Sequence, residues 1–144
     1  MKTLLHICCA PCANQPIEVL RGDGIEVTGF WYNPNIHPFT EYRSRRNCLR
    51  YYAQTIDLPL IEKNDYALRP FVREVAEDIA GRCVKCYEMR LFETAKAAKE
   101  NGFDSFTSSL FISPSLLIVA LVCIAALLAA VILLLIALKK KKNN

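Results

Sequence analysis

The sequence predicts an α/β fold in which helices flank a parallel sheet. Short stretches rich in apolar, β-branched and aromatic residues alternate with longer stretches whose apolar residues recur at helical spacing. Chains that alternate strand and helix in this way form parallel sheets covered on both faces. The length of 144 residues allows one modest domain of this kind.

The first half of the chain is expected to supply three strands and two helices. In order, these are a strand at 4–7, a helix at 11–22, a strand at 25–32, a helix at 40–56 and a strand at 58–62. Pro11 suits the first turn of the first helix, and Gly22 suits its end. Pro34 and Pro38 impose a loop between the second strand and the second helix.

The second half is expected to add two helices and a fourth strand. Phe71, Val72 and Val75 recur at helical spacing and predict a helix over 71–79, which Gly81 ends. A further helix is expected over 83–101, followed by a strand over 103–107. Sites in parallel sheets lie beyond the carboxyl ends of the strands, so the residues that follow each strand are the first candidates for function.

Five of the seven cysteines fall in two groups. The first group follows the first strand and consists of Cys8, Cys9 and Cys12; the second lies at the start of a helix and consists of Cys83 and Cys86. Thiolates at this spacing can bind one ion or cluster, and two groups together supply four sulfurs for a cubane cluster or tetrahedral zinc. The partial positive charge of a helix N-terminus also favours thiolates. A disulfide scaffold is disfavoured because no signal peptide is evident, and buried packing does not explain two such groups.

The basic residues are unevenly distributed. Lys and Arg number 18 against 14 Asp and Glu, but four of the lysines are residues 139–142, and the rest of the chain is balanced. Arg43, Arg45, Arg46 and Arg50 are interleaved with tyrosines. This composition is typical either of a nucleic-acid contact or of an exposed helix face, and both interpretations stay open.

The C-terminal part of the sequence has a different composition. Residues 116–138 contain no charge, Gly or Pro, which is the pattern and length of a transmembrane helix. The predicted organisation is therefore a cysteine-rich α/β domain at 1–115, a membrane-spanning helix at 116–138 and a basic tail at 139–144. The cysteine-rich domain is expected in the cytoplasm, anchored to the membrane by this helix.

Six motifs occur in a fixed order between residues 3 and 114. They are His6-Ile7-Cys8-Cys9-Ala10-Pro11-Cys12, Asn33-Pro34-Asn35-Ile36, Glu41-Tyr42-Arg43, Asp65-Tyr66, Arg82-Cys83-Val84-Lys85-Cys86-Tyr87 with Arg90-Leu91, and Phe106-Thr107-Ser108-Ser109-Leu110 with Ser113-Pro114. Their order and spacing resemble the epoxyqueuosine reductase family of the QueH type. The resemblance implies an adenine-nucleotide-hydrolase-like α/β fold.

The resemblance also implies a function and a cofactor. The chain would be a metal-dependent reductase that converts epoxyqueuosine to queuosine at the wobble position of tRNA. A [4Fe-4S] cluster would be bound by Cys8, Cys9, Cys83 and Cys86. Cys12 is not among these four ligands. Two interpretations stay open for it: it binds a second metal ion beside the cluster, or its side chain faces the helix. The electron donor is not indicated.

Further site residues follow from the matched motifs. The candidate proton donors are Tyr42, Asp65 and Tyr87, and the candidate substrate or tRNA contacts are Asn33, Asn35, Tyr42, Arg43, Arg45 and Arg46. An exposed ring such as Tyr32 or Tyr42 is expected to stack on an unstacked loop base. His6 is expected to be packed or hydrogen-bonded, not to bind metal.

The chain departs from this family at its C-terminal end. Family members continue with another helix and strand and with a redox-active cysteine pair, whereas here Ser115 begins the apolar segment. The α/β domain is therefore expected to be truncated. A natural membrane-anchored variant and a frameshifted gene end are both open explanations. The alternative functions are a zinc-binding module without catalysis, a membrane-anchored remnant and a thiol redox protein.

Overall fold

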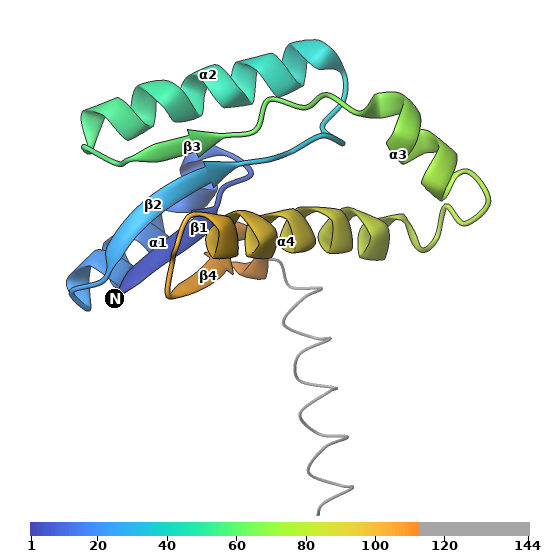
Figure 1. The fold of residues 1–144 in the computed structure, drawn as a ribbon. Helices are drawn as coiled ribbons and strands as arrows, with labels where there is room; N and C mark the ends of the chain where they lie inside the picture. The colour runs from blue at the N-terminus through green and yellow to red at the C-terminus, as the bar shows by residue number, and fades with distance from the viewer. Residues whose placement is uncertain (113–144) are drawn as a thin grey trace, which may run out of the picture. The chain divides into compact units, whose positions relative to one another are not determined.

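The computed structural model describes residues 1–112 and has a four-stranded parallel sheet with helices on both faces, as the sequence predicts (Figure 1). The strands are β1 (Lys2–His6), β2 (Glu26–Trp31), β3 (Leu60–Glu62) and β4 (Ser105–Ser108). The helices are α1 (Ala10–Gly22), α2 (Phe39–Thr55), α3 (Leu68–Val75) and α4 (Arg82–Glu100), with a 3₁₀ turn η1 (Ser109–Ile112) after β4. Every predicted strand and helix of this region is confirmed, with boundaries shifted by a few residues.

The strand order places the residues after β1 beside those after β4. The order is β3-β2-β1-β4 and all neighbours are parallel. From β1, the chain adds β2 and then β3 on one side of β1. It then returns to place β4 on the other side of β1. Such a change of direction leaves a crevice at the carboxyl ends of β1 and β4, where α/β proteins usually bind ligands.

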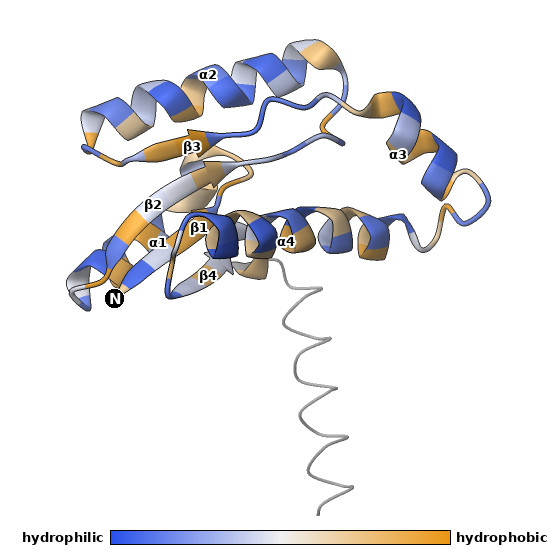
Figure 2. Ribbon diagram, in the orientation of Figure 1, coloured by the Kyte–Doolittle hydropathy of each residue, from blue (hydrophilic) through white to orange (hydrophobic). Residues whose placement is uncertain are grey.

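The core has two layers, one on each face of the sheet. Leu5 and Trp31 belong to the layer formed with α1 and α2, while Leu4 and Phe30 belong to the layer formed with α4. Alternate residues of a strand point to opposite faces, which accounts for this division. Figure 2 shows the apolar strands between helices whose outer faces are mainly polar. A Cβ at Gly29 would lie 3.0 Å from Ile7 Cδ1, so close packing on β2 favours glycine there.

Helix α3 differs from its prediction. It begins at Leu68 and ends at Val75, earlier than the expected 71–79, and it contains no buried residue. It lies beyond the ends of the strands (Figure 1), so its apolar side chains are not covered by the sheet. Val72 is consequently exposed.

The predicted membrane span cannot be compared with the structure. Within residues 1–112, none of the helices combines the length and apolar character needed to cross a bilayer. The span predicted at 116–138 and the basic tail at 139–144 lie outside the described residues. The domain boundary at residue 115 therefore stays a prediction.

Candidate functional site

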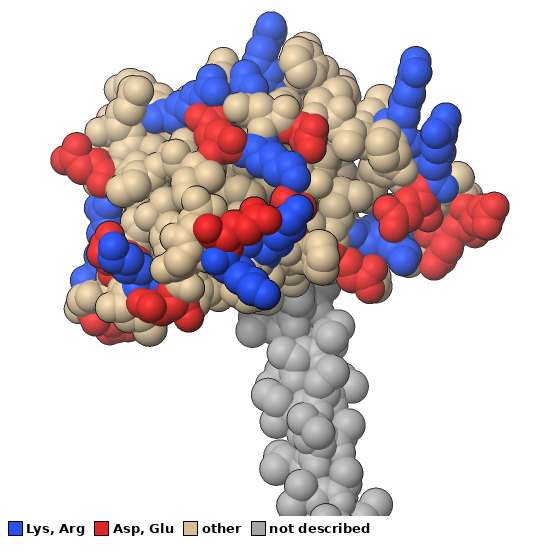
Figure 3. Space-filling model, viewed as in Figure 1, with Lys and Arg blue, Asp and Glu red and all other residues tan. Residues whose placement is uncertain are grey.

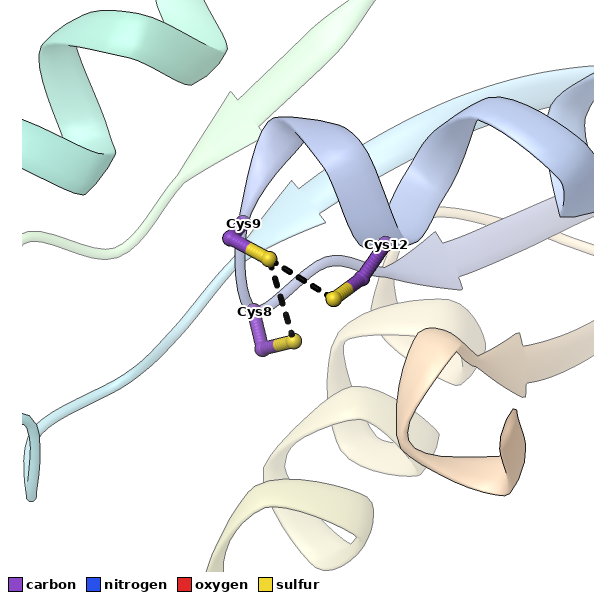
Figure 4. A group of neighbouring side chains, drawn as sticks. All are labelled: Cys8, Cys9 and Cys12. Carbon is purple, nitrogen blue, oxygen red and sulfur yellow. Dashed lines mark hydrogen bonds between the residues drawn. The ribbon is translucent and has the colours of Figure 1, made fainter. Parts of the chain in front are cut away.

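The first cysteine group lies at the turn between β1 and α1. Cys9 is the N-cap of α1, and a proline in the first helical turn separates it from Cys12. The Sγ atoms of Cys8, Cys9 and Cys12 all lie within 4.8 Å of one another (Figure 4). The Cys8 and Cys9 sulfurs are 3.9 Å apart, and the Cys9 and Cys12 sulfurs are 2.8 Å apart. All three side chains are half-buried, so the group is compact but remains accessible.

Ser109 fixes Cys8 from the neighbouring strand. The backbone N–H of Cys8 donates to Ser109 Oγ at 3.2 Å, and the Ser109 hydroxyl donates to Cys8 Sγ at 3.4 Å. These contacts join residues that are about a hundred positions apart, because β1 and β4 are paired. Ser109 was not predicted as a site residue, although it belongs to one of the six matched motifs, and that motif was the available signal.

The second cysteine group begins α4. Cys83 is exposed and Cys86 is half-buried. Asn35 Nδ2 donates to Cys86 Sγ at 2.9 Å, and Arg90 donates from Nε and Nη2 to Asn35 Oδ1 at 2.9 and 2.6 Å. These four residues and Tyr87 are among those that line a pocket of about 380 Å³. Arg90 therefore orients Asn35, which in turn donates to the Cys86 sulfur.

Arg90 is a buried cation close to both cysteine groups. Its side chain is 6% exposed, and no carboxylate in residues 1–112 lies within ion-pair distance of it. Burial lowers the pKa of Arg90, while the nearby thiols of Cys86 and Cys8 act in the opposite direction. A buried charge is costly unless an opposite charge compensates it. The position therefore suits an anionic group held between the two cysteine groups.

His6 and Asn33 are fully buried beside the site. His6 Nδ1 is 2.9 Å from Ser108 Oγ, and His6 Nε2 is 3.0 Å from the Tyr32 carbonyl oxygen, so the expected packed, hydrogen-bonded histidine is confirmed. Burial, and then the charge of Arg90, lower the pKa of His6 to about 4. Asn33 Nδ2 donates to the Ile7 carbonyl at 2.9 Å. Asn33 thus joins the carboxyl ends of β1 and β2, and its contact with substrate stays a prediction.

The arginines of α2 differ in how they are held. Arg45 donates to Glu41 at 2.6 Å, and Arg46 donates to Asn64 at 3.1 Å. The pKa of Arg45 is raised, first by the hydrogen bond to Glu41 and also by the nearby Cys9 and Cys8 thiols. Arg43 is exposed and has no ion pair or side-chain hydrogen bond within the described part of the chain. Basic and acidic side chains are interspersed on the face shown in Figure 3.

The tyrosines expected to stack on RNA bases are buried. Tyr42 is 2% exposed and Tyr32 is 9% exposed, so the expectation of an exposed ring at either position is wrong. Trp31 Nε1 donates to the Tyr42 hydroxyl at 3.2 Å, which ties Tyr42 into the core. Asp65 is exposed in the loop after β3, and Tyr87 is half-buried in the pocket beside Cys83. Of the three predicted proton donors, Tyr87 lies closest to the second cysteine group, because it is on the same helix as Cys83 and Cys86.

The three-cysteine group can hold a metal ion. Two thiolates on one tetrahedral zinc at about 2.3 Å are about 3.8 Å apart, which matches the separation of the Cys8 and Cys9 sulfurs. Cys83 and Cys86 do not belong to this compact group. A four-iron cluster is larger than a single ion and needs its thiolates farther apart than the 3.9 Å between the Cys8 and Cys9 sulfurs, so these two side chains would have to separate to hold one. Arg90, close to both groups, would compensate its negative charge.

Comparison with known proteins gives a consistent result. The family model for epoxyqueuosine reductase QueH matches residues 3–132, which extends beyond the 3–114 expected from the motifs. An epoxyqueuosine reductase QueH of Dehalococcoides mccartyi is 40% identical over 124 residues, covering 86% of this chain and 68% of that protein. Those of Histophilus somni and Haemophilus influenzae are 39% and 38% identical, each over 116 residues and 78% of this chain. The chain spans only 48% and 47% of the length of these last two proteins.

Proposed function

The chain belongs to the epoxyqueuosine reductase QueH family, and from this premise we propose that it reduces epoxyqueuosine in tRNA to queuosine. The observation that carries the proposal is the buried guanidinium of Arg90, which lies near Cys8 of the first cysteine group and Cys86 of the second. Parallel α/β folds place their reactive sites at this edge. Converting an epoxide to an alkene and water consumes two electrons and two protons, so the site must receive both.

We propose that Cys8, Cys9, Cys83 and Cys86 hold a [4Fe-4S] cluster at this edge. Soft thiolate ligands suit iron–sulfur clusters, and the buried guanidinium of Arg90 suits a group of net negative charge. When bound, such a cluster, with one cysteine on each iron, would supply single electrons to the substrate. Asn35, whose amide donates to the Cys86 sulfur, would hold that ligand in place.

Tyr87 is the proton donor that the arrangement favours. It lines the pocket together with Cys83 and Cys86, where a substrate oxygen near the cysteines would be within its reach. The Tyr42 hydroxyl lies in the core beside Trp31, and Asp65 is exposed in a loop, so both are less suitably placed. The phenol O–H of Tyr87 is the group that would donate a proton to the oxygen as the carbon–oxygen bond breaks.

The cluster is tested by anaerobic reconstitution of the full chain, followed by iron, sulfide and zinc analysis. About four irons and four sulfides per chain are expected, and both are expected to be lost from the double variant Cys83→Ala, Cys86→Ala. Cys48→Ala is the matched control, because Cys48 is exposed on α2 and outside both groups. The loaded chain is then incubated with epoxyqueuosine-containing tRNA and a strong chemical reductant. Nucleoside mass spectrometry is expected to show loss of one oxygen; unchanged epoxyqueuosine with an intact cluster would refute the catalytic proposal.

A second candidate is supported by the compact first group. The 3.9 Å separation of the Cys8 and Cys9 sulfurs suits one tetrahedral ion, with Cys12 as a third ligand. The chain would then bind a single zinc ion at this group. The same metal analysis separates the two candidates: one zinc without sulfide, retained in the double variant at α4 and lost in Cys12→Ala, would favour the zinc site over the cluster.

Arg43 is expected to contact a tRNA phosphate. It is the arginine of the predicted set that has no partner in the described residues, so its charge is available to a ligand. Replacing Arg43 with Ala is expected to weaken tRNA binding and to reduce the slope of log affinity against log salt by about 1. Binding is measured by filter retention at several salt concentrations. Arg50→Ala is the control, because Arg50 already donates to Glu62 at 2.8 Å. Equal salt slopes for the unmodified chain, Arg43→Ala and Arg50→Ala would contradict a phosphate contact by Arg43.

A further inference from the structure

The residues from Cys9 to Cys12 form a Cys-x-x-Cys motif at the start of α1, directly after β1. The two sulfurs are 2.8 Å apart, which is about 1 Å closer than two thiolates on one tetrahedral zinc. Figure 4 shows that the Cys9 sulfur points toward that of Cys12. The separation is therefore shorter than metal binding alone would explain.

We propose that Cys9 and Cys12 form a reversible dithiol–disulfide pair, which prevents metal binding at the first cysteine group when it is oxidised. A disulfide bond is about 2.05 Å long, so the sulfurs must approach by less than about 1 Å. Both side chains are half-buried, and a small disulfide reagent can reach them. A proline in the first turn restricts the backbone between the two residues, and holds them at this spacing.

The other cysteines of the site are less suited to this reaction. Cys8 and Cys9 are adjacent in sequence, and a disulfide between neighbours would distort the peptide that links them. No hydrogen bond joins Cys83 to Cys86 in residues 1–112, and the Cys86 sulfur instead accepts from Asn35. The oxidation is therefore expected to be selective for the pair at the start of α1.

The reaction is a thiol–disulfide exchange with a low-molecular-weight disulfide such as oxidised glutathione. One cysteine sulfur attacks the reagent, breaks its S–S bond and releases one glutathione thiolate, which leaves a mixed disulfide on the chain. The second cysteine sulfur then attacks this mixed disulfide and releases the second glutathione. The two cysteines lose two electrons and two protons, and the reagent gains them as two thiols. Because metal binding needs thiolates, the disulfide removes two of the three ligands at once.

The test uses the full chain after metal removal, incubated with oxidised glutathione under nitrogen, alkylated and digested with trypsin. The tryptic peptide of residues 3–21 is expected to carry one alkyl group, on Cys8, and a disulfide between Cys9 and Cys12. Cys83 and Cys86 are expected to remain alkylated. Cadmium binding, followed by the thiolate absorption band, is expected to be lost at the first group and restored by dithiothreitol.

Matched variants make the assignment specific. Cys86→Ser should leave the disulfide unchanged, whereas Cys12→Ser should give at most a glutathione adduct. Independent alkylation of Cys9 and Cys12 after oxidation, or a disulfide formed equally at Cys83 and Cys86, would overturn the proposal. The peptide measurement on the unmodified chain is decisive even if Cys12→Ser does not fold. It is also independent of iron loading and of tRNA conversion.

Discussion

Replacing Arg90 with Gln is expected to lower the reduction potential of the proposed cluster by on the order of 90 mV. At an effective dielectric constant of about 20, Coulomb's law gives about 2 kcal/mol for two unit charges about 8 Å apart, which for a one-electron couple is about 90 mV. Arg90 is buried, lies close to Cys8 and Cys86, and has no carboxylate partner in residues 1–112. Its charge is therefore poorly screened and stabilises the reduced, more negative state.

The potential is measured by an anaerobic redox titration followed by electron paramagnetic resonance. Arg50→Gln removes the same charge from a half-buried arginine that is paired with Glu62 on another part of the surface, and we expect no shift there. Circular dichroism shows whether each variant is folded. Equal potentials for Arg90→Gln and the unmodified chain, at equal iron content, would mean that the charge of Arg90 does not act on the cluster.

Replacing Trp31 with Ala is expected to lower the free energy of unfolding by about 3–5 kcal/mol. Trp31 is fully buried at the end of β2, where it packs against the ring of Tyr42 at a centroid distance of 5.4 Å. The substitution leaves a large cavity between the sheet and α2, and it also leaves the Tyr42 hydroxyl without its donor. Because α2 carries Arg43, the loss of this packing would also weaken the predicted tRNA contact.

Urea denaturation followed by circular dichroism measures this change. Tyr42→Phe is the matched variant, since it removes the same hydrogen bond and keeps the ring; we expect it to cost about 0.5–1.5 kcal/mol. The same variant tests the predicted catalytic role of Tyr42, because a proton donor could not be replaced by Phe without loss of turnover. If both substitutions cost the same, the tryptophan contributes mainly its hydrogen bond and not its packing.

The cysteine groups show how far the sequence could predict the site. Their positions after the first strand and at the start of α4 followed from local patterns, and the structure confirms both placements. The contact of Cys8 with Ser109 could not be predicted from spacing, because it depends on the pairing of β1 with β4. The relay from Arg90 through Asn35 to Cys86 similarly joins three side chains from two distant parts of the chain.

Side-chain burial was the property that the sequence predicted least well. Tyr32 and Tyr42 were the candidates for an exposed ring that stacks on an RNA base, but both are buried. On a strand or helix, the face that a residue presents to the core depends on which element packs there. For Tyr42, that element is β2 through Trp31, which no local pattern specifies.

The sequence by itself determined the order of strands and helices, the parallel α/β class and the two cysteine groups, because each depends on local periodicity and spacing. Only the tertiary structure decided which of those residues meet. It brought Arg90 close to both cysteine groups, buried Tyr42, and placed the sulfurs of Cys9 and Cys12 at 2.8 Å. These features depend on strand order and on packing between distant elements, and such long-range contacts leave no periodic signal in the sequence.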